Sequence, residues 1–182
     1  MCYSGDNKCY SYLRIFVTSE TYQGNLGGAL GADEKCQLLA DNAGLDGAFK
    51  AWISQSESSS PAQSWEQHMP FRPYYLVDDT KIADDWNHLT NTNAVDNELH
   101  HVINKDENGQ LVETAPLRVW TNTNWDGNRV STDNCNGWTK SGKDWTSKYG
   151  SIESTSHNWS WAGGMRCNWL GRLYCIQQNT NA

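Results

Sequence analysis

Residues 165–177 read MRCNWLGRLYCIQ, and the two cysteines of this stretch decide how the chain is interpreted. Cys167 and Cys175 stand eight residues apart, and Cys175 lies in a short apolar run typical of a strand. Three interpretations are open: a metal site, a pair of reactive thiols, or the ends of two separate disulfides.

The residues around these cysteines favour neither a zinc site nor a reactive thiol pair. Structural zinc sites use close pairs such as Cys-x2-4-Cys or His-x3-5-His, and the sequence contains neither. Reactive thiols need an electropositive, partly exposed setting. Arg166 beside Cys167 offers only a weak one, and the apolar run around Cys175 is typical of a buried, inert sulfur.

The cysteine count favours disulfides. An even number of cysteines in an exported chain indicates paired bridges, and six cysteines allow fifteen pairings. The six residues are Cys2, Cys9, Cys36, Cys135, Cys167 and Cys175. A lipidated Cys2 is the alternative for the first of them.

Length and composition indicate one extracellular domain covering residues 1–182. The net charge is −7 and no block of Lys and Arg occurs, which argues against nucleic acid or a heparin-like partner. No apolar run reaches the ~18 residues that a membrane helix needs. The cysteines indicate export, so we expect a secreted or cell-surface protein. The first residues do not form a signal peptide, and we expect that the signal peptide is not present in this chain.

Hydrophobic periodicity predicts an α+β fold. The expected strands are residues 13–19, 48–54, 74–79, 117–123 and 171–177. One main helix is expected at 31–44, and a hairpin at 100–114 with its turn at 107–109. A second turn is expected at 78–80, in a solvated acidic segment. Residues 122–168 show little periodicity and are predicted to be a long, loop-rich segment that presents a ligand-binding surface.

The acidic segment contains four aspartates that could be taken for metal ligands. They are Asp78, Asp79, Asp84 and Asp85. We assign them to the solvated end of a hairpin instead.

The order of these features resembles the long form of the C-type-lectin-like fold. An N-terminal cysteine pair (CYSGDNKCY), a helix bearing one cysteine, a Trp-Ile strand (AWIS) and a Cys-Trp segment (NCNGW) occur in that order, before two final cysteines. The resemblance implies mostly antiparallel strands, one main N-terminal helix and an N-terminal hairpin at 1–12. It also implies the disulfides Cys2–Cys9, Cys36–Cys175 and Cys135–Cys167. Closing these loops would stabilise the fold by at most about 2.5, 5 and 4 kcal/mol respectively.

A closer resemblance covers residues 13–178. The segments RIFVTSETYQGNLGGALGADEKCQLLADNAGL, YYLVDDTKIADDWNHLT, VWTNT and RLYCIQQ look like a bacterial family of uncharacterised secreted and surface domains with an endostatin-like fold. This resemblance implies an extracellular, disulfide-bonded module for ligand binding or adhesion.

Calcium is the only cofactor that the sequence suggests. The calcium–sugar site usual in C-type lectins is not expected, because Ala162, Gly163 and Gly164 stand where its ligands would be. The stretch NTNWDGNRVSTD (122–133) has the spacing of an oxygen-cage loop. Its candidate ligands are Asn122, Asn124, Asp126, Asn128 and Asp133. The alternative is a turn whose Asn and Asp side chains bind their own backbone.

Aromatic and amide side chains of the loop-rich segment are the candidate ligand-binding residues. Flat rings beside short polar groups are typical of carbohydrate and protein grooves. The candidates are Trp125, Asn128, Trp145, Tyr149, Trp159 and Trp161. The alternative is that these rings form a small core of their own, and we assign Trp120 and Trp138 to that role.

The expected function is recognition rather than catalysis. The sequence contains no Gly-x-Ser-x-Gly, phosphate-loop or His-Glu-x-x-His motif. We expect a glycan or a surface protein of a host or neighbouring cell as the partner. The alternatives are a display protein with variable loops and, from the enzymes, a thiol enzyme of the formylglycine-generating type.

Overall fold

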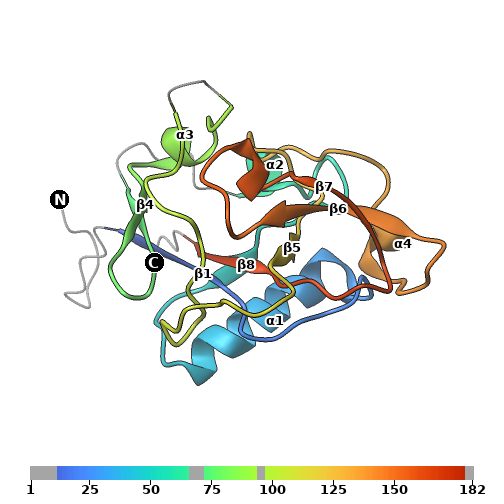
Figure 1. The fold of residues 1–182 in the computed structure, drawn as a ribbon, viewed down its shortest axis with the longest axis horizontal. Coiled ribbons are helices and arrows are strands. Elements are labelled where there is room, and N and C mark those ends of the chain that lie inside the picture. The colour runs from blue at the N-terminus through green and yellow to red at the C-terminus, as the bar shows by residue number, and fades with distance from the viewer. Residues whose placement is uncertain (1–11, 66–71, 94–96, 179–182) are drawn as a thin grey trace.

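The computed structural model describes residues 12–65, 72–93 and 97–178. These form a mixed α+β fold with more strands than helices (Figure 1). The strands are β1 (Leu13–Val17), β2 (Phe49–Ala51), β3 (Tyr74–Tyr75), β4 (Lys81–Ala83), β5 (Arg118–Trp120), β6 (Thr146–Ser151), β7 (Gly163–Arg166) and β8 (Tyr174–Gln177). The helices are α1 (Gly28–Asn42), α2 (Pro61–Ser64), α3 (Trp86–Leu89), α4 (Cys135–Trp138) and the 3-10 turn η1 (His157–Trp159).

The strand that contains Cys175 lies inside the main sheet. This sheet has the order β2-β8-β1-β3-β4, and β8 pairs antiparallel with both β1 and β2. The β1–β3 pair is parallel. Every residue of β8 is buried, which explains why its sequence is a nearly continuous apolar run.

Both faces of the main sheet are covered by apolar side chains, because successive residues of a strand point to opposite faces. Ile15 and Val17 of β1 join a core cluster with Trp52 and Trp159. Phe16, between them, joins a second cluster. That second cluster lies between the sheet and α1, the helix that runs below β8 and β1 in Figure 1.

Helix α1 is the predicted main helix, and it begins earlier than predicted, at Gly28. Its buried stripe includes Cys36, which forms a disulfide with Cys175 of β8. Polar side chains of α1 also bind the edge strand β2: Asp33 accepts a hydrogen bond of 2.8 Å from the Ala51 amide. The helix is therefore attached covalently to the central strand and by hydrogen bonds to the edge strand.

The segment 122–168 contains more regular structure than predicted. Strands β6 and β7 both lie in it, and with β5 they form a second sheet of order β5-β6-β7. The prediction missed them because TSKYGS and GGMR have almost no apolar alternation. A disulfide between Cys135 and Cys167 joins α4, near the start of this segment, to its end just after β7.

The other predicted strands lie at the observed positions, but the predicted ranges are longer than the observed strands. The turn at 78–80 joins β3 to β4, as predicted. The hairpin predicted at 100–114 is reduced to a single bridge between Lys105 and Leu111. The short helices were not predicted, and α4 is a left-handed turn in which Cys135, Asn136 and Trp138 have positive φ angles.

Two sequence predictions fall wholly or partly beyond the described residues. The N-terminal hairpin at 1–12, with its Cys2–Cys9 bridge, lies outside them except for Tyr12.

Among the helices that are described, none combines the length and apolarity that a membrane crossing requires.

Candidate functional site

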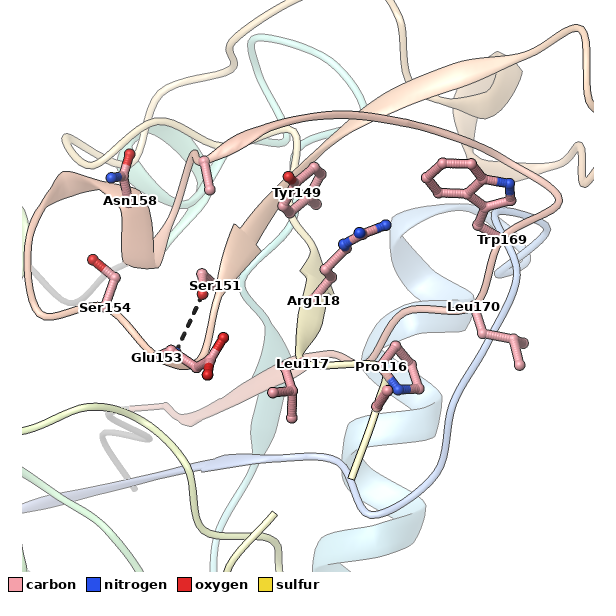
Figure 2. A pocket seen from close by; sticks show the side chains of 12 residues that line it. Pro116, Leu117, Arg118, Tyr149, Ser151, Glu153, Ser154, Asn158, Trp169 and Leu170 are labelled. Atoms are coloured by element: carbon pink, nitrogen blue, oxygen red, sulfur yellow. Dashed lines mark hydrogen bonds between the residues drawn. The ribbon is translucent and has the colours of Figure 1, made fainter. Parts of the chain in front are cut away.

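A cavity with a volume of about 880 Å³ opens beside the second sheet (Figure 2). This volume lies in the range of small-molecule binding sites. Its wall comes from β5, β6, the turns around η1 and the segment between β7 and β8. The lining residues are Ala115, Pro116, Leu117, Arg118, Tyr149, Ser151, Glu153, Ser154, Asn158, Ala162, Trp169 and Leu170. We call this cavity the Arg118 pocket.

Strand β6 supplies two side chains to the pocket. Tyr149 and Ser151 are two residues apart, so they point to the same face of the sheet. Gly163 on the neighbouring strand β7 makes room for the tyrosine ring: a Cβ on Gly163 would lie 3.2 Å from the ring and from its hydroxyl. A larger residue at 163 would displace Tyr149 from this position.

Arg118 lies between two aromatic rings of the pocket. Its Cζ atom is 5.3 Å from the ring centroid of Tyr149 and 5.3 Å from that of Trp169. Figure 2 shows the side chain extending from β5 into the gap between the two rings. These cation–π contacts hold the guanidinium in place.

The guanidinium of Arg118 has free donors. Its Nε and Nη atoms form no hydrogen bond or ion pair with any residue in the described parts of the chain. Arginine carries five N–H donors in a planar fork that matches a carboxylate or sulfate. The pocket therefore holds a positioned cation whose hydrogen-bonding capacity is unused.

The exposed wall of the pocket is formed by Trp169 and Leu170, which are 45% and 48% exposed. Both ends of this short segment are anchored. Cys167 is bonded to Cys135, and Gly171 exchanges two backbone hydrogen bonds, of 2.7 and 2.9 Å, with Tyr22. An exposed aromatic ring on an anchored turn is available to a ligand at a low cost in conformational entropy.

The opposite wall is polar and uncharged apart from one carboxylate. Ser154 and Asn158 point into this side of the pocket with Glu153 in Figure 2. The backbone amide of Glu153 donates to the Ser151 hydroxyl at 3.3 Å, which closes the turn after β6. Hydroxyl and amide groups both donate and accept hydrogen bonds, so they can bind the hydroxyl groups of a sugar in place of water.

The structure places the predicted ligand-binding aromatics in different environments. Tyr149 is the one that lines the Arg118 pocket. Trp145 and Trp161 are 43% and 41% exposed and lie outside its lining, and Trp125 is half-buried. Trp159 is fully buried and donates to the Thr92 hydroxyl, so it takes the packing role that was the alternative for it.

The two tryptophans assigned to the core are confirmed as core residues. Trp120 and Trp138 are fully buried, and their ring centroids are 5.7 Å apart. Each also donates its indole N–H to a backbone carbonyl, that of Tyr22 and that of Ser54 respectively.

Three side chains of the predicted calcium loop accept hydrogen bonds from other groups of the protein. Asp126 accepts from the backbone amide of Asn128 at 3.0 Å. Asn124 accepts from the amide of Trp125, also at 3.0 Å. Asn128, which is also a candidate ligand-binding residue, accepts from the Gln63 side chain at 3.3 Å.

The other two residues of the predicted calcium loop differ in burial. Asn122 is buried and binds Ser131 and the carbonyl of Ser54. Asp133 is exposed and its nearest cation is Lys148, at 3.7 Å. Of the five side chains, Asp126 makes the contact of an Asx turn, by accepting from the amide two residues on. Calcium binding by this loop stays a prediction.

The cysteines of the described residues are all paired. The bridges Cys36–Cys175 and Cys135–Cys167 are those that the resemblance implied for these four residues. A thiol enzyme would need a free thiol, and the described part of the chain contains none.

No protein-family model matches the chain, and no curated protein matches it significantly.

Sequence reasoning missed the residues that give the pocket its chemistry. Arg118 was counted as part of a strand, and Leu170 was not considered. The sequence offered one signal for Arg118: a charged residue next to the apolar pair Val119 and Trp120, which are buried in the structure, is expected at an exposed position. Its pairing with Trp169 depends on the tertiary fold, which brings the segment after β7 beside β5.

Proposed function

We propose that this chain is an extracellular ligand-binding module that holds an acidic saccharide in the Arg118 pocket. The observation that carries the proposal is the guanidinium of Arg118, which is positioned by two aromatic rings and whose N–H donors have no acceptor among the described residues. A carboxylate or sulfate would accept from two of these donors at once.

The rest of the pocket suits a sugar ring. Trp169 and Leu170 present apolar surface that would pack against the C–H groups of a pyranose. Ser154 and Asn158 offer partners for its hydroxyl groups. The combination supports a glycan over a purely apolar ligand.

The overall charge limits the kind of anion. A chain with a net charge of −7 repels polyanions at long range. We therefore propose a saccharide with one acidic group near the contact, such as a uronic acid, rather than a heparin-like polymer.

Disulfides and fold support the extracellular assignment. Disulfides are typical of oxidising compartments, and the described residues contain two. We propose that the frame is C-type-lectin-like, as the sequence resemblance implies, with the second sheet and its loops as the ligand-binding side. We propose a non-enzymatic adhesion role for this module.

A glycan array tests the proposal. The oxidised protein is applied to paired saccharides that differ only in whether a carboxylate has been reduced to an alcohol. We expect binding to the acidic members, and a loss of about 10- to 100-fold with Arg118→Gln, since a hydrogen bond to a charged group contributes about 1.5–3 kcal/mol.

Arg166→Gln is the matched control, because Arg166 is an exposed arginine on β7 outside the pocket lining. It should bind like the wild type. An array without hits, together with capture of a protein receptor, would reverse the proposal in favour of a protein ligand.

A further inference from the structure

A second cluster of functional side chains lies far from the Arg118 pocket in sequence. Asp84, His88 and His100 place one carboxylate and two imidazoles so that one ligand atom from each lies within 4.8 Å of the others. The Oδ2 atom of Asp84 is 3.3 Å from Nδ1 of His88, and its Oδ1 atom is 3.1 Å from Nε2 of His100. The described residues contain no other group of three such side chains.

Secondary structure fixes the cluster. Asp84 directly precedes Asp85, the N-cap of α3, and His88 lies within that helix. A hydrogen bond of 3.2 Å from the Asp84 amide to Nδ1 of His88 holds the two residues together. His100 is joined to the strand before them, because its amide donates to the Ile82 carbonyl at 2.9 Å. Asp85, between Asp84 and α3, caps the helix by accepting from the His88 amide.

The hydrogen bonds of His88 define its tautomer. Its Nε2 lies 2.8 Å from the Glu98 carbonyl, which can only accept, so Nε2 carries the proton. Its Nδ1 accepts from the Asp84 amide at 3.2 Å, so Nδ1 presents a lone pair. A histidine that donates one ring N–H to a backbone carbonyl and points the other nitrogen outward has the usual arrangement of a metal ligand.

The lone pair of His88 is next to a negative charge. Nδ1 and the carboxylate oxygen Oδ2 of Asp84 are both acceptors in this tautomer, and they are 3.3 Å apart. Two acceptors at this distance repel unless a proton or a metal ion lies between them, and a proton on Nδ1 would make the contact an ion pair. Ligands bound at about 2.0–2.2 Å around a tetrahedral ion are themselves about 3.4 Å apart. The two imidazoles lie 3.3 and 3.1 Å from different oxygens of Asp84, and the three ligand atoms lie within 4.8 Å of one another, so the side chains would have to close slightly around an ion.

We propose that Asp84, His88 and His100 bind a divalent transition-metal ion of the zinc type, in competition with the ammonium group of Lys81. Two imidazoles and one carboxylate suit such an ion better than calcium or magnesium, which prefer oxygen ligands. Asp84 and His100 are exposed, so a further coordination position faces solvent.

Lys81 is the cation that the cluster already contains. Its Nζ atom forms an ion pair with Oδ1 of Asp84. The lysine side chain is 41% exposed, so it is free to turn towards solvent. Metal binding would also replace the 3.2 Å bond from the Asp84 amide to His88, and water can then hydrate that amide.

Isothermal titration of the tag-free, oxidised chain with zinc chloride tests the proposal. We expect one zinc ion per chain. His88→Gln and His100→Gln should each weaken binding at least tenfold, since even the loss of a partner behind a ligand typically costs 10- to 100-fold. His100 is exposed, so its variant keeps the inference testable if His88→Gln disturbs α3.

Two further variants complete the design. Lys81→Met should tighten zinc binding, because it removes a positive charge at the carboxylate. His157→Gln, which changes an exposed histidine of η1, should bind zinc like the wild type. The proposal is overturned if the wild type shows no saturable binding, if His157→Gln is as weak as the cluster variants, or if Lys81→Met leaves the affinity unchanged.

Discussion

Asp33 shows how a single half-buried carboxylate sets a pH dependence of stability. Its carboxylate lies in the interface between α1 and β2, where it accepts the Ala51 amide. Burial raises the pKa of Asp33 to about 6, and the hydrogen bond from Ala51 and the charge of Lys50 only partly oppose this rise. The folded state therefore binds the proton of Asp33 more tightly than the unfolded state does.

The sign of the effect follows from this difference. Between about pH 4 and pH 6 the folded state holds more protons at Asp33, so this group's contribution to stability falls as the pH rises. Asp33→Asn keeps an acceptor for the Ala51 amide without a charge. We expect the variant to gain about 1–2 kcal/mol over the wild type at pH 7, and less at pH 4.

Urea unfolding at the two pH values measures this gain. Glu34→Gln, at an exposed position of the same helix, serves as the control and should not change the pH dependence. An Asp33→Asn variant that is no more stable at pH 7 than the wild type would contradict the burial effect.

Single residues also show where sequence reasoning ends. Tyr149 was identified as a ligand-binding candidate because aromatic rings are enriched in its segment. Arg118 was not, because an exposed arginine on a strand has no signature until its neighbours are known. Its two ring partners come from β6 and from the segment after β7, and only the fold brings these together.

At the scale of the elements, strand β6 packs closely against the backbone of η1 at Gly150, and a substitution there tests this packing. A Cβ added to Gly150 of β6 would lie 2.0 Å from the Trp159 carbonyl oxygen and 3.0 Å from that of Ser160. Both are backbone atoms, which cannot move aside as a flexible side chain would. Gly150→Ala should therefore cost about 1–3 kcal/mol or more.

Gly164 on the adjacent strand β7 supplies the matched control. The nearest atom to its added Cβ is the Ser147 carbonyl oxygen at 3.7 Å, an ordinary contact. Gly164→Ala should change stability by less than about 1 kcal/mol, as measured by urea unfolding. Equal losses in the two variants would mean that η1 does not press on β6 as described.

The elements found from the sequence and those missed differ in their patterns. Helix α1 was predicted because its buried residues, including Cys36 and Leu39, repeat with helical spacing. Strands β6 and β7 were missed because they are held by backbone pairing, and their side chains include glycine, serine and lysine. Pairing with a distant strand leaves no periodic signal in such short segments.

For the whole molecule, the two described disulfides are expected to supply a large part of the stability. Cys36–Cys175 closes a separation of 139 residues and Cys135–Cys167 one of 32. Loop-closure entropy gives at most about 5 and 4 kcal/mol for these bridges. The net stability of a domain is about 5–15 kcal/mol, so reduction of both should unfold much of the protein at 37 °C.

Paired serine substitutions measure each bridge by urea unfolding. Removing Cys36 and Cys175 together should cost more than removing Cys135 and Cys167. A larger loss from the shorter loop would show that the second bridge acts through the folded state, by holding the left-handed turn of α4, more than through the unfolded chain.

The central claim for the molecule as a whole is that the Arg118 pocket, and not the wider aromatic surface, holds the ligand. Trp169 lines this pocket, whereas Trp145, which is similarly exposed, does not. The most direct measurement is calorimetric titration of the tightest-binding saccharide into wild type, Trp169→Ala and Trp145→Ala. We predict at least a tenfold loss of affinity for Trp169→Ala and a change of less than about twofold for Trp145→Ala. A loss confined to Trp145→Ala, or of equal size in both variants, would contradict the claim.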